Sequence, residues 1–266
     1  MMPEPEAVGT VVQLYTTATK GFALREVEHV QVTASGIAGN REFFLVDIDE
    51  RLYSVPTDPV FLDCWTAYDP VANTFRSGRR AIVDVEAEVL PRGPVRPFQF
   101  DERTVDGRWA PGPWDAWFSE LAGRNLRLVQ CADPGGGGDV HPVTIVSTAS
   151  IESLGHEADG SRVDGRRFRL NMTLDLGPAP YREDSWAGHV LTVGDAELRV
   201  IGGVPRCVAV EHRPDDGDRA LQVQRRIREV RGATPSEAGP AVLFGMYARV
   251  VATGSVRVGD LVALLT

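Results

Sequence analysis

The chain has 266 residues, 43% of them hydrophobic and 24% charged, so it can form one large domain or two smaller ones with ample core. A formal net charge of −9 argues against non-specific binding to nucleic acid. No apolar run approaches the roughly 20 residues that cross a bilayer, and the acidic, proline-containing start Met1–Glu6 is unlike a signal peptide. We therefore expect a soluble, cytoplasmic protein with no membrane or nucleic-acid partner.

Short, β-branched apolar runs bounded by Gly, Pro or Asp recur along the whole chain. Their regular spacing, with turn residues between them, predicts mixed or antiparallel sheet arranged as barrels or a sandwich. The expected strands are 11–15, 27–32, 43–47, 82–89, 126–129, 143–146, 168–174, 190–193, 198–201, 208–210, 243–251 and 261–265.

Only three stretches have helical features. Pro113 suits a first helical turn, and the segment that it opens carries Trp114, Trp117 and Phe118 on one face. Ser147 is a suitable N-cap for a helix over 148–154, and 221–230 has apolar residues at helical spacing with arginines between them. None of the three is long enough to organise the fold, so we predict a mostly β protein with a few helices.

Residues 203–211, Gly-Val-Pro-Arg-Cys-Val-Ala-Val-Glu, are the strongest candidate for chemistry. Arg206 directly precedes Cys207, and its guanidinium favours the thiolate, which is the form that attacks electrophiles or binds soft metals. The alternative is an inert cysteine at the start of a buried strand. With Cys64 and Cys131 far away in the sequence, the three cysteines fit neither a zinc site nor a disulfide framework.

Several arginines have places from which they could bind an anion. Arg41 precedes a predicted strand, and in an extended 167–171 segment Arg167, Arg169 and Asn171 share one face. If these side chains meet Arg206, they form a group of bidentate donors beside the thiolate, suited to a phosphorylated or anionic ligand. Alternatively, each arginine covers a strand edge or pairs with a nearby carboxylate.

A second possible anion site lies at Ser147, Thr148 and Ser150. These residues open a predicted helix, where backbone N–H groups and hydroxyls can face an anion. Ordinary capping accounts for the same residues without any ligand.

The four glycines at 135–138 follow Pro134. No glycine pattern typical of phosphate binding follows a strand there, so we expect a linker or mobile loop, and Cys131–Asp139 as an internal boundary.

The remaining polar candidates have open roles. Glu183 and Asp184 are expected in a solvated turn and His212 in a surface turn, whereas His141 either lines a pocket or packs at a strand start. The 92–113 segment is expected to be a connector or a substrate-side loop.

Taken together, these segments resemble the MOSC-domain proteins, named for the C-terminal domain of molybdenum cofactor sulfurase. The resemblance extends over about 11–265 and is closest to the two-part form found in amidoxime-reducing components. It rests on 41–47 (REFFLVD), 147–151 (STASI), 167–171 (RFRLN), 183–186 (EDSW), 205–207 (PRC), 244–247 (FGMY) and 258–260 (VGD). It implies a mostly β, α+β fold, with a MOSC β-barrel in 125–266 preceded by a smaller N-terminal β-barrel region in 1–124.

The resemblance also implies a molybdopterin-type cofactor bound by this chain. Cys207 matches the cysteine that binds molybdenum in the redox members of the family, with Arg206 beside it as a second catalytic residue. The residues expected to hold the cofactor are Arg41, Thr19, Lys20, Ser147, Thr148, Ser150, Arg167, Arg169 and Asn171.

The chain departs from the family pattern near its first strand. Family members carry Tyr-Pro-Val-Lys-Ser there, whereas this chain has Tyr15-Thr16-Thr17-Ala18-Thr19, with its single lysine displaced to Lys20. Losing an ammonium at the position of Ala18 removes a charged hydrogen bond of about 1.5–3 kcal/mol, unless Lys20 or an arginine compensates. Val204 replaces the first cysteine of a Cys-x-x-Cys-like form, so disulfide chemistry is not expected.

The function implied is that of a molybdenum-cofactor oxidoreductase. It would reduce N–O bonds of N-hydroxylated small molecules by two-electron oxygen-atom transfer at a molybdenum bound to Cys207, with electrons from a separate electron-transfer protein. One alternative is a sulfurtransferase with a persulfide on Cys207. Another is a cofactor carrier, or a diverged member that has lost the cofactor through Ala18 and binds a different anionic ligand.

Overall fold

The structure is a computed structural model that describes residues 6–56, 58–100, 103–138, 140–157, 160–234 and 241–265. Most of the Met1–Glu6 start and Asp139, both used in the sequence interpretation, lie outside these residues. None of the described helices combines the length and apolar character needed to span a membrane.

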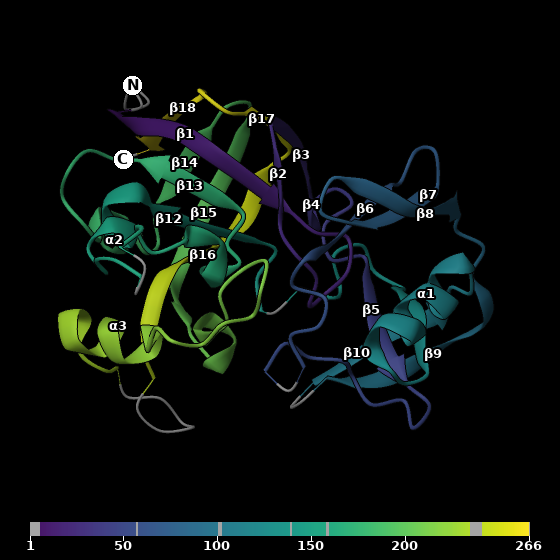
Figure 1. Cartoon of the computed structure of the whole chain (residues 1–266). Helices are drawn as coiled ribbons and strands as arrows, with labels where there is room; N and C mark the ends of the chain where they lie inside the picture. Colours follow the sequence, from purple (N-terminus) through teal and green to yellow (C-terminus); the bar gives the residue numbers. More distant parts are fainter. Residues whose placement is uncertain are drawn as a thin grey trace.

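Seven described strands form a closed barrel (Figure 1). Neighbouring strands are antiparallel except for one parallel pair, β12 with β13, and β13 pairs back onto β1 to close the ring. In barrel order the strands are β13 (Met172–Asp175), β12 (Val143–Ser147), β16 (Leu243–Ala252), β15 (Ala196–Pro205), β14 (Val190–Val193), β18 (Leu261–Leu265) and β1 (Glu6–Thr16). The predicted mostly β fold with a MOSC-type barrel is confirmed.

The barrel forms because its strands alternate inward-facing apolar residues with outward-facing ones. Val11, Leu14, Leu198 and Val262 are almost fully buried in one shared core. Short strands flank the barrel: β2 (Arg25–Val27) extends its sheet beside β1, while β3 (His29–Thr33), β4 (Gly36–Ile37) and β17 (Gly254–Arg257) form a separate three-stranded sheet.

A second body stands beside the barrel (Figure 1). Its four-stranded sheet has the order β5 (Phe43–Asp47), β11 (Leu126–Cys131), β10 (Arg103–Trp109) and β9 (Arg92–Phe100). Its three-stranded sheet contains β6 (Cys64–Asp69), β7 (Thr74–Arg79) and β8 (Ile82–Glu88). Phe43 and Leu45 face an aromatic core that includes Trp114 of α1 (Pro113–Ala122), whereas Phe44 and Val46 face a smaller cluster on the other side. This two-sided burial explains why 43–47 reads as a continuous apolar run.

The strand pairings group the chain differently from its sequence order. The second body contains β5 to β11, residues Phe43–Cys131, while β1 to β4 lie with the barrel. The predicted division into 1–124 and 125–266 stays a prediction. Residue 125 falls between α1 and β11, which are both in the second body.

The three predicted helices are present. Besides α1 they are α2 (Thr148–Glu152) and α3 (Val223–Arg231), and the Ser147 side chain caps α2 by accepting a hydrogen bond from the backbone N–H of Ser150. A further turn of 3₁₀ helix, η2 (Arg182–Trp186), follows β13.

Two predicted strands are wrong in places that matter for the site. Residues 208–210 belong to a 3₁₀ helix, η3 (Val208–Glu211), and the start of the predicted 168–174 strand is the end of another, η1 (Gly165–Phe168). The predicted connector 92–113 instead contains the hairpin β9–β10. Apolar runs of this length do not distinguish a strand from a short helical turn.

Candidate functional site

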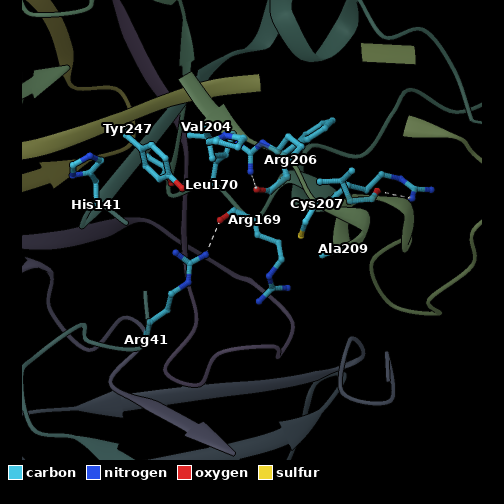
Figure 2. Close-up of a pocket in the computed structure, with 14 residues that line it drawn as sticks. Arg41, His141, Arg169, Leu170, Val204, Arg206, Cys207, Ala209 and Tyr247 are labelled. Atoms are coloured by element: carbon cyan, nitrogen blue, oxygen red, sulfur yellow. Dashed lines mark hydrogen bonds between the residues drawn. The ribbon is translucent and has the colours of Figure 1, made fainter. Parts of the chain in front are cut away.

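A cleft lies at the end of β15, where η1, η3 and the start of β12 meet the loop before β5 (Figure 2). The residues labelled on its walls are Arg41, His141, Arg169, Leu170, Val204, Arg206, Cys207, Ala209 and Tyr247. The cleft therefore collects the predicted cysteine and all four predicted arginines, Arg167 included, from segments that are far apart in the sequence.

Cys207 stands at the open side of this cleft. Its backbone is extended (φ −95°, ψ 178°) at the N-cap of η3, and the side chain is exposed. The other two thiols are buried in the second body, where burial raises the pKa of Cys64 and of Cys131 to about 12. Of the three cysteines, Cys207 is thus the one available for chemistry. The described residues contain no cluster of three His, Cys, Asp or Glu side chains that could hold a metal by themselves.

Arg206 is engaged by backbone carbonyl groups. Its Nε donates to the carbonyl oxygen of Phe244 at 2.8 Å, Nη1 donates to that of Phe168 at 2.8 Å, and Nη2 also donates to Phe244. These bonds tie the end of β15 to β16 and η1, so Arg206 holds the cleft wall together. The predicted influence of Arg206 on the neighbouring thiol stays a prediction.

Arg167 faces the interior of the protein. Its side chain is inaccessible to solvent and forms a bidentate ion pair with Glu157, Nε–Oε1 2.7 Å and Nη2–Oε2 2.8 Å. Nη1 donates to the carbonyl oxygens of Glu211 at 3.0 Å and of Val210 at 3.4 Å. Arg167 therefore braces η3, directly behind Cys207, with every guanidinium nitrogen engaged by the protein itself.

Arg41 and Arg169 are in direct contact with each other in the cleft. Both have a left-handed backbone with φ 53°, and Nη2 of Arg41 donates to the carbonyl oxygen of Arg169 at 2.8 Å (Figure 2). Nη2 of Arg169 donates to the carbonyl oxygen of Phe22 at 2.6 Å. The left-handed residue in each loop turns the side chain out of the direction that an extended chain would give it.

Asn171 does not line the cleft and has a structural role instead. It is buried, and its Oδ1 accepts hydrogen bonds from the backbone N–H and the hydroxyl of Thr144 at 3.2 and 3.0 Å. Its Nδ2 donates to the carbonyl oxygen of Tyr15 at 3.3 Å. The amide thus links β12 and β1 across β13 and helps to close the barrel.

The predicted anion site at the start of α2 is filled by a carboxylate of the protein. Oε1 of Glu183 accepts hydrogen bonds from the backbone N–H of Ser147 at 3.0 Å and from the hydroxyl of Ser150 at 2.8 Å. Glu183 is 1% exposed, so its expected place in a solvated turn is wrong. Thr148 is half-buried beside them, and Ser147, the last residue of β12, lies about 10 Å along that strand from Thr144, which lines the cleft.

Thr19, Lys20 and Ala18 face the second body. Thr19 is fully buried, and Nζ of Lys20 lies 5.8 Å from the centre of the Phe100 ring. Ala18 is 1% exposed within the aromatic core around Phe43. The side chain that replaces the family lysine therefore does not line the Cys207 cleft.

His141 and Tyr247 are lining residues whose roles the sequence left open or did not assign. Their rings meet edge to face at 5.1 Å, and Nε of Arg249 donates to Nδ1 of His141 at 3.3 Å. Burial, together with the nearby Arg249 charge, lowers the pKa of His141. Tyr247 belongs to the 244–247 segment used for the family resemblance, which was the available signal. His212, expected in a surface turn, is 5% exposed, so that expectation is wrong.

The glycine run at 135–138 is a hydrogen-bonded turn packed on Arg41. The N–H of Gly137 donates to the carbonyl oxygen of Arg41 at 2.9 Å, and that of Gly138 donates to Gly135 at 2.9 Å. A Cβ on Gly137 would lie 2.7 Å from the Arg41 oxygen, so glycine permits the close approach. The expectation of a linker or mobile loop missed this contact because it depends on a residue almost 100 positions away.

Comparison with known proteins identifies the family. Residues 133–263 match the MOSC domain, so this part of the chain is a MOSC domain. The mitochondrial amidoxime-reducing component 1 of Mus musculus is 34% identical over 132 residues, which are 48% of this chain and 37% of that protein. The mitochondrial amidoxime reducing component 2 of Macaca fascicularis is 27% identical over 295 residues, covering 96% of this chain and 83% of that protein.

The first of these alignments covers little more than a third of the relative's own length. Among solved structures, the YuaD protein from Bacillus subtilis aligns with 98% of this chain and 94% of its own, at 14% identity and a TM-score of 0.43. With a TM-score this low, the assignment of the barrel rests on the strand pairings themselves.

Proposed function

We propose that this protein is a molybdenum-cofactor-dependent oxidoreductase that reduces N–O bonds of N-hydroxylated small molecules. The observation that carries the proposal is the meeting of the exposed Cys207 thiol with Arg41 and Arg169 in one cleft. Similarity to proteins named amidoxime-reducing components supports this reaction class. We further propose that the protein acts in the cytoplasm and takes electrons from a separate electron-transfer protein.

The chemistry of the cleft residues fits the proposed cofactor. A thiolate is a preferred ligand for a soft metal centre, and guanidinium groups form charge-assisted hydrogen bonds with a phosphate. A dithiolene cofactor brings its own sulfur ligands, so a single protein thiolate completes the set. The free space inside the cleft is about 80 Å³, the share of two or three water molecules. A ligand of pterin size is larger than this space, so it would have to displace side chains of the cleft or extend out of it.

Each lining residue has a distinct part in the proposal. Cys207 would bind the metal, and Arg41 and Arg169 would hold the phosphate. Arg206 and Arg167 would keep the thiol in place, because their hydrogen bonds fix both ends of the segment that carries it. His141 would offer its Nε2–H to the substrate, since Nδ1 accepts from Arg249 and the proton is then on Nε2.

When bound, the cofactor supplies the two-electron step in which the substrate N–O bond breaks. Two electrons from the external donor and two protons from solvent balance the reaction, and the oxygen atom leaves as water. The protein contributes ligation, orientation and positive charge.

The decisive experiment is elemental analysis for molybdenum together with detection of oxidised pterin, on protein purified from a host that makes the cofactor. We expect near-stoichiometric metal and pterin in the wild type, and loss of the metal in Cys207→Ser. Loaded protein should then reduce an aromatic amidoxime with an external electron donor. Absence of both metal and pterin would overturn the proposal and leave the cofactor-free alternative at this site.

A sulfurtransferase is the second candidate, supported by the isolation of Cys207. Its thiol is exposed, and the other two cysteines are buried in the second body, so no neighbouring thiol is placed to discharge a persulfide on it. Mass spectrometry after incubation with a PLP-dependent cysteine desulfurase and cysteine would detect a persulfide as one added sulfur on Cys207. A stable persulfide in protein without molybdenum would favour this candidate, and molybdenum without persulfide would exclude it.

A further inference from the structure

A second cavity adjoins the Cys207 cleft on the side of the glycine turn. It has room for about 170 Å³, and Arg41 and His141 line both cavities. Its other walls include Asn40, Arg103 and the turn at 135–138. The two spaces therefore lie next to each other, with Arg41 and His141 in the wall of both.

Backbone carbonyl groups of the glycine turn hold the Arg103 side chain in place. It extends from β10, its Nη2 donates to the carbonyl oxygens of Gly136 at 3.1 Å and of Gly138, and its guanidinium lies 5.3 Å from the centre of the Phe100 ring. Because these contacts fix the guanidinium, its charge has a defined place although the residue is exposed.

Arg41 supplies the second positive charge and is 92% buried, since 8% of it is exposed. Its backbone is held on both sides: its N–H donates to Thr17 at 2.7 Å, and its carbonyl oxygen accepts from Gly137 at 2.9 Å. The glycine turn thus positions Arg41 and Arg103 together.

The described lining of this cavity is positive and contains no carboxylate. Glu42 does not line the cavity, but its carboxylate lies behind the wall, where Oε2 accepts a hydrogen bond from the N–H of Gly135 at 3.2 Å. Burial and the nearby Arg249 charge lower the pKa of His141, which disfavours a positive charge on its ring. Because Arg41 is also one of the two arginines proposed to hold the cofactor phosphate, Arg103 is the guanidinium that remains for a second anion. With no carboxylate in the described lining, Arg103 favours an anionic group over a neutral one.

We propose that this cavity is a substrate subsite that binds a carboxylate or phosphate-type substituent while the N–O group of the same molecule lies at Cys207. The assignment rests on the proposed function for its substrate class. It gives the glycine turn a role in specificity, as the support for the two arginines.

The test compares three ligands that differ only in their para substituent: benzamidoxime, its 4-carboxylate and its 4-phosphonate. Binding to the loaded protein is measured by calorimetry, and KM and kcat are measured with an external electron donor. We expect at least one charged compound to bind about fivefold or more tightly than benzamidoxime, with the difference in KM rather than kcat. The variant Arg103→Gln should lose this preference, and the two charged compounds show which anion the cavity prefers.

Arg108→Gln is the matched control, because Arg108 is also exposed on β10 but does not line the cavity. It should keep the preference for the charged compounds. Equal binding of all three ligands, or a preference that survives in Arg103→Gln, would overturn the subsite. If none of the ligands is reduced but calorimetry still shows a charge preference that depends on Arg103, the proposed function fails and the anion-binding cavity stands.

Discussion

Replacing Arg167 by methionine tests whether Arg167 has a structural role while Arg169 binds the proposed cofactor. The Arg167 side chain is inaccessible and Glu157 is only 6% accessible, so the substitution leaves a buried carboxylate without its partner. Breaking a buried ion pair from one side costs about 3–5 kcal/mol, and the bonds to the Val210 and Glu211 carbonyl groups are lost as well. This loss is a large share of the roughly 5–15 kcal/mol that stabilises a typical domain.

The assay is urea unfolding at neutral pH, followed by fluorescence, with molybdenum content measured on the same preparations. Arg169→Met is the matched comparison. It loses the bond to the Phe22 carbonyl group, worth about 1 kcal/mol, so we expect a smaller destabilisation than in Arg167→Met but a loss of bound cofactor of about tenfold or more. The double variant Arg167→Met/Glu157→Leu should recover part of the lost stability. A stable Arg167→Met protein that has lost its cofactor would refute this division of roles.

Three further predictions follow from the contacts around the site. At neutral pH, iodoacetamide should modify Cys207 alone, because burial raises the pKa of the other two thiols to about 12. Bound cofactor should protect Cys207 from this modification. A second modified cysteine found by mass spectrometry in the folded protein would contradict the prediction. Gly137→Ala should lower the free energy of unfolding in urea by about 1–3 kcal/mol and weaken cofactor retention, since its Cβ would press on the Arg41 carbonyl oxygen. Gly138→Ala, whose nearest contact is at 3.1 Å inside the turn, should cost less, and equal effects of the two variants would show that the contact of Gly137 with Arg41 does not matter. Ala18→Lys should lower the free energy of unfolding by about 3 kcal/mol or more without increasing molybdenum content, because position 18 lies in the aromatic core. A higher molybdenum content in this variant would show that position 18 does reach the site.

Much of the fold follows from local sequence pattern. The strand at 43–47 and those at 190–193 and 261–265 have the predicted limits, and the helices begin within two residues of the expected positions. Strands such as Thr74–Arg79 were missed because they carry few apolar residues and are stabilised by pairing with their neighbours. Likewise, the insertion of a whole second body between β4 and β12 depends on long-range pairing, for which single-sequence patterns carry no signal.

The candidate site was predictable in composition but not in the role of each residue. Arg41, Arg169 and Cys207 meet as expected, because the family resemblance carried long-range information that periodicity does not. Glu183 was assigned to a solvated turn because its charge suggested exposure. Its actual burial depends on Ser147 and Ser150, which bind it from 33 or more residues away. Partners of buried charges are the part of a site that local sequence specifies least.

The segment around Arg167 and Arg169 shows how a single backbone angle changes the function of neighbouring charges. In a strand, residues two apart point to the same face, so both arginines would have entered one site. Here η1 ends at Phe168 and Arg169 takes a left-handed conformation, so Arg167 turns inward to Glu157 while Arg169 reaches the cleft. The protein thereby places two guanidinium groups close together, one neutralised by a buried acid and the other in reach of a ligand. That separation allows a chain with a net charge of −9 to keep an arginine-lined cleft beside its exposed thiol.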